Sequence, residues 1–198
     1  VYMIKTNRMI PLLLALLKLG AFLAGCTGSS TDRCVKVEGD TISIPSMRVS
    51  FSFPAPWFVV TDEELEAISQ NQDLINDYVD EEGNLVFSRP EAYTTEEVLL
   101  LNGKTLETCR ISAKEDLNEY SLETFASNMF DQMQEDMDEI SLPQTWSTGK
   151  YKGYAISAVP KDSTLHYKYY YLHEKSTFVE IITTGFSDHV KVGEIIES

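Results

Sequence analysis

The sequence lacks several features that would assign a function directly. Its three cysteines are far apart, which excludes the close cysteine pairs typical of a zinc site. It has only 16 Lys and Arg residues against 31 acidic ones, so a nucleic-acid partner is not expected. The most prominent apolar run, residues 9–24, is too short to span a bilayer comfortably.

Recognisable catalytic motifs are also missing. The chain contains neither a G-x-S-x-G nucleophile elbow nor an H-E-x-x-H metalloprotease helix. Only His166, His173 and His189 are histidines that would act as bases near neutral pH. In and after aromatic strands, such histidines are more often edge or core residues than catalysts. An enzyme is therefore the less favoured hypothesis.

The N-terminal region has the layout of a secretory signal. Lys5 and Arg8 precede the apolar run, and small residues follow it. The last four residues of this region, 23–26, read Leu-Ala-Gly-Cys and resemble the lipobox of bacterial lipoproteins. The resemblance implies that residues 1–25 are removed and that Cys26 carries lipid at the new N-terminus. A plain signal peptide or an uncleaved membrane anchor is the alternative interpretation.

The remaining chain is long enough for one ordinary domain. Residues 26–40 are small, polar and charged, which predicts a flexible tether, and residues 41–198 are expected to form the folded domain. Loss of three basic residues with the signal changes the formal charge from −15 to −18. If Cys26 is lipidated, Cys34 and Cys109 remain, and the sequence is compatible both with a disulfide between them and with two separate thiols.

Local patterns predict both helices and strands. Thr61 and Glu64 form a capping box that predicts a helix start, and a stripe of apolar residues predicts a second helix over about 121–137. Asn102-Gly103 predicts a tight hairpin between strands 98–101 and 105–113. Further strands are predicted at 41–44, 49–53, 154–159, 165–173 and 177–184, and a short final helix at about 188–196.

The order of these elements resembles a known family. The segments FSFPAPW, SLETFASNMF and WSTGKYKGYAISAV, followed by the strand-rich C-terminal region from LHYKYYYLHEK, are similar to the PsbP-like alpha-beta sandwich family. The resemblance covers about residues 41–198. It implies an α+β fold, with helices on both faces of an antiparallel sheet, that usually serves as a binding module.

The acidic turn of residues 80–84 has the composition of a calcium-binding loop but not its spacing. An EF-hand loop with Gly83 at its sixth position would place Tyr78 first and Arg89 twelfth, and neither supplies a carboxylate. A looser site using Asp77, Asp80 and Glu82 is less favoured than a solvated turn, because no spacing rule supports it. We therefore expect no metal and no cofactor.

A locally basic, tyrosine-rich region stands out from the acidic chain. If the strands of residues 150–175 are neighbours, they gather basic and aromatic side chains in one patch: Lys150, Tyr151, Lys152, Tyr154, Lys168 and Tyr170. Such a patch would face anionic lipid or an acidic partner. The simpler interpretation is that these lysines keep exposed strands soluble.

Together these patterns predict a lipid-anchored module of a bacterial cell envelope. It would lie on the outer side of the cytoplasmic membrane or on the outer membrane, held through the lipid on Cys26. The expected role is non-enzymatic binding or assistance, with an envelope protein or an anionic surface as partner. The alternative is an extracytoplasmic hydrolase whose active site carries no recognisable motif.

Overall fold

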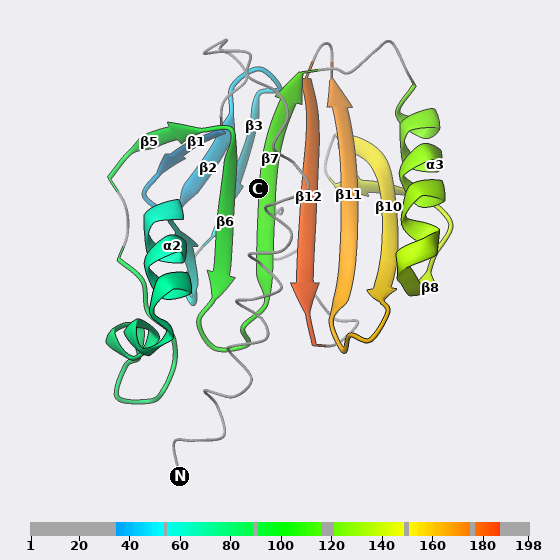
Figure 1. The fold of residues 1–198 in the computed structure, drawn as a ribbon. Coiled ribbons are helices and arrows are strands. Elements are labelled where there is room, and N and C mark those ends of the chain that lie inside the picture. Colours follow the sequence, from blue (N-terminus) through cyan, green and yellow to red (C-terminus); the bar gives the residue numbers. More distant parts are fainter. Residues whose placement is uncertain are drawn as a thin grey trace.

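A computed structural model describes residues 35–53, 55–88, 91–115, 121–148, 151–174 and 177–186. These residues form two antiparallel sheets and a few helices (Figure 1). The smaller sheet has the strand order β3-β2-β1-β5. Its strands are β1 (Val35–Glu38), β2 (Thr41–Ile44), β3 (Val49–Ser52) and β5 (Tyr93–Thr95).

The larger sheet has the order β4-β6-β7-β12-β11-β10-β8, and β9 also pairs with β10. Its strands are β4 (Trp57–Val60), β6 (Glu97–Asn102), β7 (Thr108–Glu115), β8 (Met137–Ile140), β9 (Gln144–Thr148), β10 (Tyr151–Pro160), β11 (His166–Glu174) and β12 (Thr177–Gly185). All nine residues of β12, which lies between β7 and β11, are buried. The antiparallel architecture predicted from the sequence is confirmed.

The predicted helix starts at Thr61 and Ser121 are confirmed by their caps. α2 (Asp62–Gln70) begins with the capping box, in which the Thr61 hydroxyl accepts from the Glu64 N–H and Glu64 accepts from the Thr61 N–H. α3 (Leu122–Met133) begins after Ser121, whose hydroxyl accepts from the Thr124 N–H. Short 3₁₀ helices follow them, η2 (Gln72–Tyr78) and η3 (Gln134–Asp136).

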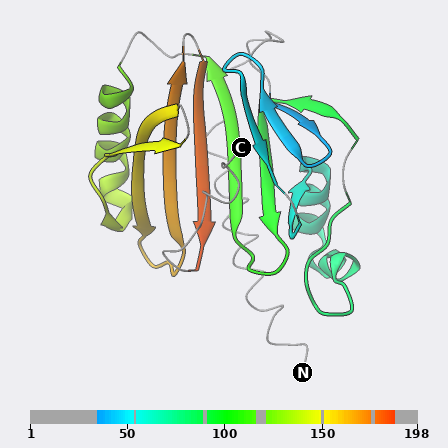
Figure 2. The same cartoon turned by 180° about the vertical axis from the view of Figure 1, so that it is seen from behind.

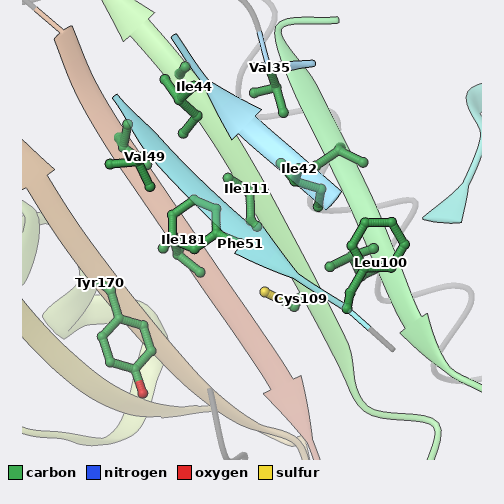
Figure 3. Close-up of a cluster of buried hydrophobic side chains, with 14 of the residues drawn as sticks. Val35, Ile42, Ile44, Val49, Phe51, Leu100, Cys109, Ile111, Tyr170 and Ile181 are labelled. Atoms are coloured by element: carbon green, nitrogen blue, oxygen red, sulfur yellow. The ribbon is translucent and has the colours of Figure 1, made fainter. Parts of the chain in front are cut away.

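The two faces of the larger sheet are packed against different layers. One face packs against the smaller sheet, and its core includes Phe51, Cys109 and Ile181 (Figures 2 and 3). The other face packs against helices, with Ile68 of α2 and Ala126 of α3 in a second core. Both described α-helices thus lie on the same side. The predicted cover of helices on both faces is not confirmed, because a sheet covers the second face.

One predicted boundary changes. The predicted tether is wrong at its C-terminal end, because residues 35–38 form strand β1 with Val35 and Val37 buried. The signal, residues 26–34 and the predicted final helix lie outside the described residues. No helix within the described ranges is long and apolar enough to cross a membrane.

The predicted 102–103 hairpin is present, but its connection is longer than a two-residue turn. β6 and β7 pair up to Leu101 and Thr108. Asn102 begins the loop by accepting from the N–H groups of Lys104 and Thr105 through its Oδ1. The residue of this loop with a positive φ is Leu106, at 62°. Glycine is needed at position 103 because the main chain of Leu85 lies too close for a Cβ atom.

Candidate functional site

The predicted basic tyrosine patch is not assembled as one surface. Lys150 lies outside the described residues. Tyr151 and Tyr170 pack with the core beneath the smaller sheet, whereas Tyr154 packs with the core beneath the helices. Because side chains of a strand alternate between faces, Lys152 shares the face of Tyr154. The patch is therefore divided by the plane of the larger sheet.

Tyr170 is a core residue rather than a contact residue. Only 4% of it is exposed, and burial is the main reason that its pKa rises to about 12. Its ring lies 4.8 Å from that of Trp146 in β9, and the Lys168 Nζ lies 5.6 Å from the centre of the Tyr170 ring. These contacts hold β9 against the edge of the sheet and occupy the aromatic face.

Tyr151 connects the two sheets. Its hydroxyl donates to the main-chain oxygen of Arg48 at 2.9 Å. Arg48 ends the turn between β2 and β3 with a φ of 55°, a conformation that is uncommon for a residue other than glycine. The bond brings the 45–48 turn to the beginning of β10, where Lys152 is exposed.

Cys109 lies in β7 at the centre of the core between the sheets (Figure 3). It forms no disulfide with any described residue and has no exposed surface, and burial raises its pKa to about 12. Its thiolate, the reactive form, is therefore scarce at neutral pH. Cys34 lies outside the described residues, so pairing between the two stays a prediction.

We predict that a thiol reagent at pH 8 leaves Cys109 unmodified in the folded chain and modifies it in urea. The chain for this measurement has Cys26→Ser and Cys34→Ser, so that mass spectrometry reports on Cys109 alone. Rapid labelling without urea would contradict the buried position. In a chain that retains Cys34, absence of labelling even in urea would show the disulfide.

The two described histidines are placed too far apart to act together. His166 and His173 are the first and eighth residues of β11, so their main chains are separated by roughly 23 Å. Both are half-buried. His189 lies outside the described residues. The histidines thus offer no combined acid–base pair in the part of the chain that is described.

The acidic 80–84 turn is organised by its own hydrogen bonds. The Asp80 carboxylate accepts from the main-chain N–H groups of Glu82 and Asn84 at 2.9 and 2.8 Å. The bond from Asn84 is the largest cause that lowers the pKa of Asp80. Across the described ranges, no group of three or more His, Cys, Asp or Glu side chains is arranged to hold a metal. The side chains of Asp80, Glu81 and Glu82 in this turn are exposed.

The structure reveals a different cluster, on the helix-side face of the larger sheet. Strand register places Glu97, Ser112, Glu180, Tyr171 and Tyr154 side by side across five strands. Arg110 and Tyr169 belong to the next row, and Tyr167 to the row after it. We call this set the polar face: Glu97, Arg110, Ser112, Tyr167, Tyr169, Tyr171 and Glu180.

Arg110 is the central charge of the polar face. Only 6% of it is exposed, and its Nε lies 3.2 Å from the Glu97 Oε1. Glu180, also 6% exposed, occupies a diagonal position on the neighbouring strand, within reach of long side chains. Removing an ionised side chain from water is costly unless opposite charges lie near it. The flanking glutamates supply these charges.

Several buried polar atoms on this face have no hydrogen-bond partner among the described residues. They are Nε and Nη1 of Arg110, Oγ of Ser112 and the hydroxyl of Tyr171. The Arg110–Glu97 contact is therefore an ion pair without hydrogen-bond geometry. Buried polar groups are normally satisfied, so such atoms mark places where bound water or a ligand oxygen would be held.

The tyrosines of the polar face have pKa values raised above the ordinary value. Burial is the main reason that the pKa values of Tyr169 and Tyr171 are raised, and the negative charge of Glu180 adds to it. Burial also raises the pKa of Tyr167, while the positive charge of Arg110 opposes the change. These hydroxyls are hydrogen-bond donors, not bases, at physiological pH.

The polar face was not predicted from the sequence. Its one visible signal is Arg110 inside TLETCRISA, a charged residue on the opposite side of the strand from Cys109 and Ile111. An inward-facing charge in a strand needs a partner, but the sequence does not show that the partners are Glu97 and Glu180. Only the register of three strands brings them together.

Comparison with known proteins gives a limited result. No family model matches the sequence, and no curated protein matches it. The solved structures that match include the solution structure of cyanobacterial PsbP (CyanoP) from Synechocystis sp. PCC 6803. It shares 11% sequence identity over 84% of this chain and 88% of that chain, with a TM-score of 0.40. At this level of similarity, function has to be argued from the residues of this chain.

Proposed function

We propose that this protein is a lipid-anchored lipoprotein of the bacterial cell envelope, in which a folded domain acts as a non-enzymatic binding or accessory module. The observation that carries the proposal is the position of the first strand relative to the lipobox. Cys26 is followed by residues 27–34, and β1 begins at Val35. A chain cleaved and lipidated at Cys26 would thus keep its domain close to the membrane surface.

The chemistry of the polar face supports binding rather than catalysis. Covalent catalysis requires a nucleophile activated by a nearby base. On this face the central guanidinium instead contacts a carboxylate, and the tyrosine hydroxyls are kept protonated. Such groups hold a polar molecule or water by donating hydrogen bonds. We propose further that the domain is PsbP-like, on the strength of the order of its sequence segments.

The anchor is tested by Cys26→Ala in the full chain expressed in a bacterium that processes lipoproteins. We expect the variant to incorporate no labelled fatty acid and to be found uncleaved or released from its normal membrane location, because the lipid is joined to the protein through the cysteine sulfur. Electrophoresis and fluorography measure the label. Cys34→Ala is the matched control and is expected to be lipidated normally. Equal labelling of the Cys26→Ala chain would reject the proposal.

A further inference from the structure

We propose that the tethered domain meets an anionic lipid surface with one particular end, which we call the anchor end. It comprises the start of β1, the 45–48 turn and the start of β10, with exposed basic residues Lys36, Arg48 and Lys152. This inference rests on the proposed lipid anchor at Cys26. It adds which surface faces the bilayer and which is left for a partner.

The length of the tether limits how far the anchor end can move from the membrane. From Cys26 to Val35 there are nine residue steps, because 35 − 26 = 9. Whatever its conformation, a chain of this length spans at most about 30 Å. The nine-residue strand β11 alone is about 30 Å long. The tether therefore favours states in which the opposite end of the domain points away from the bilayer.

Strand register defines what lies beside the tether. Val35 pairs with Thr95, and Lys36 pairs with Ser43, so β2 runs from its pairing with β1 towards the 45–48 turn. The Tyr151 hydroxyl bonds to the main chain of Arg48 and thereby brings the start of β10 to the same end. In Figure 1 the turn between β2 and β3 lies at the top, and the loop after α2 and η2 lies at the bottom.

The two ends of the domain differ in charge in the direction that binding to an anionic surface requires. The anchor end has the three exposed basic side chains together with two exposed acids, Glu96 in the connection between β5 and β6 and Glu123 in the first turn of α3. The opposite end, which we call the distal end, contains two exposed lysines, Lys104 and Lys161. Its acidic residues are more numerous: Asp80, Glu81, Glu82, Glu107, Glu135, Asp136 and Asp162. Headgroups of negative charge attract the first end and repel the second.

Even a few basic residues are sufficient to orient a tethered domain on an anionic membrane. A lysine or arginine close to an anionic membrane strengthens attraction about fivefold at moderate salt. The effects of Arg48 and Lys152 then multiply to roughly 25-fold, which the acids Glu96 and Glu123 at the same end oppose. The lipid already removes most of the cost of association, so these charges act only on rotation of the domain. Their effect is expected to decrease as salt screens it.

The experiment measures orientation of the lipidated full chain on vesicles. Single cysteines are introduced by Pro45→Cys at the anchor end and by Glu81→Cys at the distal end, both exposed positions, in a chain with Cys34→Ser. Each is labelled with a donor fluorophore, and energy transfer to acceptor-labelled lipid is recorded. On phosphatidylglycerol vesicles we expect stronger transfer from residue 45 than from residue 81. The difference should decrease on phosphatidylcholine vesicles and in high salt.

Matched charge reversals complete the test. Arg48→Glu with Lys152→Glu should abolish most of the difference between the two labels, whereas Lys104→Glu with Lys161→Glu at the distal end should preserve it. Equal transfer from both positions on anionic vesicles, or stronger transfer from residue 81, would overturn the inference while leaving the lipid anchor intact. Failure of the labelled chain to float with any vesicle would instead reject the anchor itself.

Discussion

Gly103→Ala is expected to destabilise the domain severely, by about 3 kcal/mol or more, because the added methyl group has no space. A Cβ at this position would lie 1.9 Å from the main-chain oxygen of Leu85. The glycine also receives the N–H of Leu85 on its own oxygen and donates its N–H to the oxygen of Pro56. Three chain segments meet here, so none can move away without breaking these bonds.

Urea unfolding of the chain without its signal measures the effect. Gly39→Ala is the matched control: nothing lies within 4 Å of its added Cβ, although its φ of 59° disfavours alanine. We expect a loss of about 1 kcal/mol there, the usual cost of the left-handed conformation. If the two variants lost the same stability, close approach at Gly103 would not be the reason that glycine is needed.

Arg110→Met is expected to cost about 3–5 kcal/mol, the range for breaking one side of a buried ion pair. The variant retains much of the aliphatic volume but leaves Glu97 and Glu180 without the central positive charge. Glu180 is the more serious loss, because it is almost fully buried whereas the side chain of Glu97 is 36% exposed. The free energy of unfolding in urea at pH 7 gives the comparison.

Two further variants identify why Arg110→Met loses stability. Arg110→Met combined with Glu97→Gln and Glu180→Gln removes the uncompensated charges, and we expect it to recover much of the lost stability. Glu97→Gln alone should cost less than Arg110→Met, because its side chain reaches solvent. If the triple variant were no more stable than the single one, packing of the arginine stem, and not its charge, would explain the loss.

The starts of the two helices could be predicted because helix caps and apolar stripes are patterns of neighbouring residues. Ser121 and the apolar stripe after it located α3, and Thr61 with Glu64 located α2. The predicted helix over 121–137 continues too far, because residues from Met137 onward pair with β10 as strand β8. That pairing is a tertiary contact, and it outweighs the helical spacing of the methionines.

The first strand was missed although its pattern is visible. Val35 and Val37 alternate with Lys36 and Glu38, which is the pattern of a half-buried strand. Its proximity to the lipobox and its polar surroundings favoured a tether. The patch of tyrosines failed for another reason: adjacent strands do bring Tyr154 and Tyr170 near each other in the sheet, but on opposite faces. Which residues share a face depends on register, which the sequence alone does not determine.

The position of β12 has a consequence for how the chain acquires its fold. Its partners in the sheet are β11, which it follows directly, and β7, which pairs Thr108 with Thr184 across 76 residues of sequence, since 184 − 108 = 76. A chain synthesised from its N-terminus therefore exposes the open edge of β7 until β12 has been made. Pairs so distant in sequence close slowly. Pairing of β12 with β7 thus joins two groups of strands, β4-β6-β7 and β12-β11-β10-β8, into one sheet that folds as a single cooperative unit.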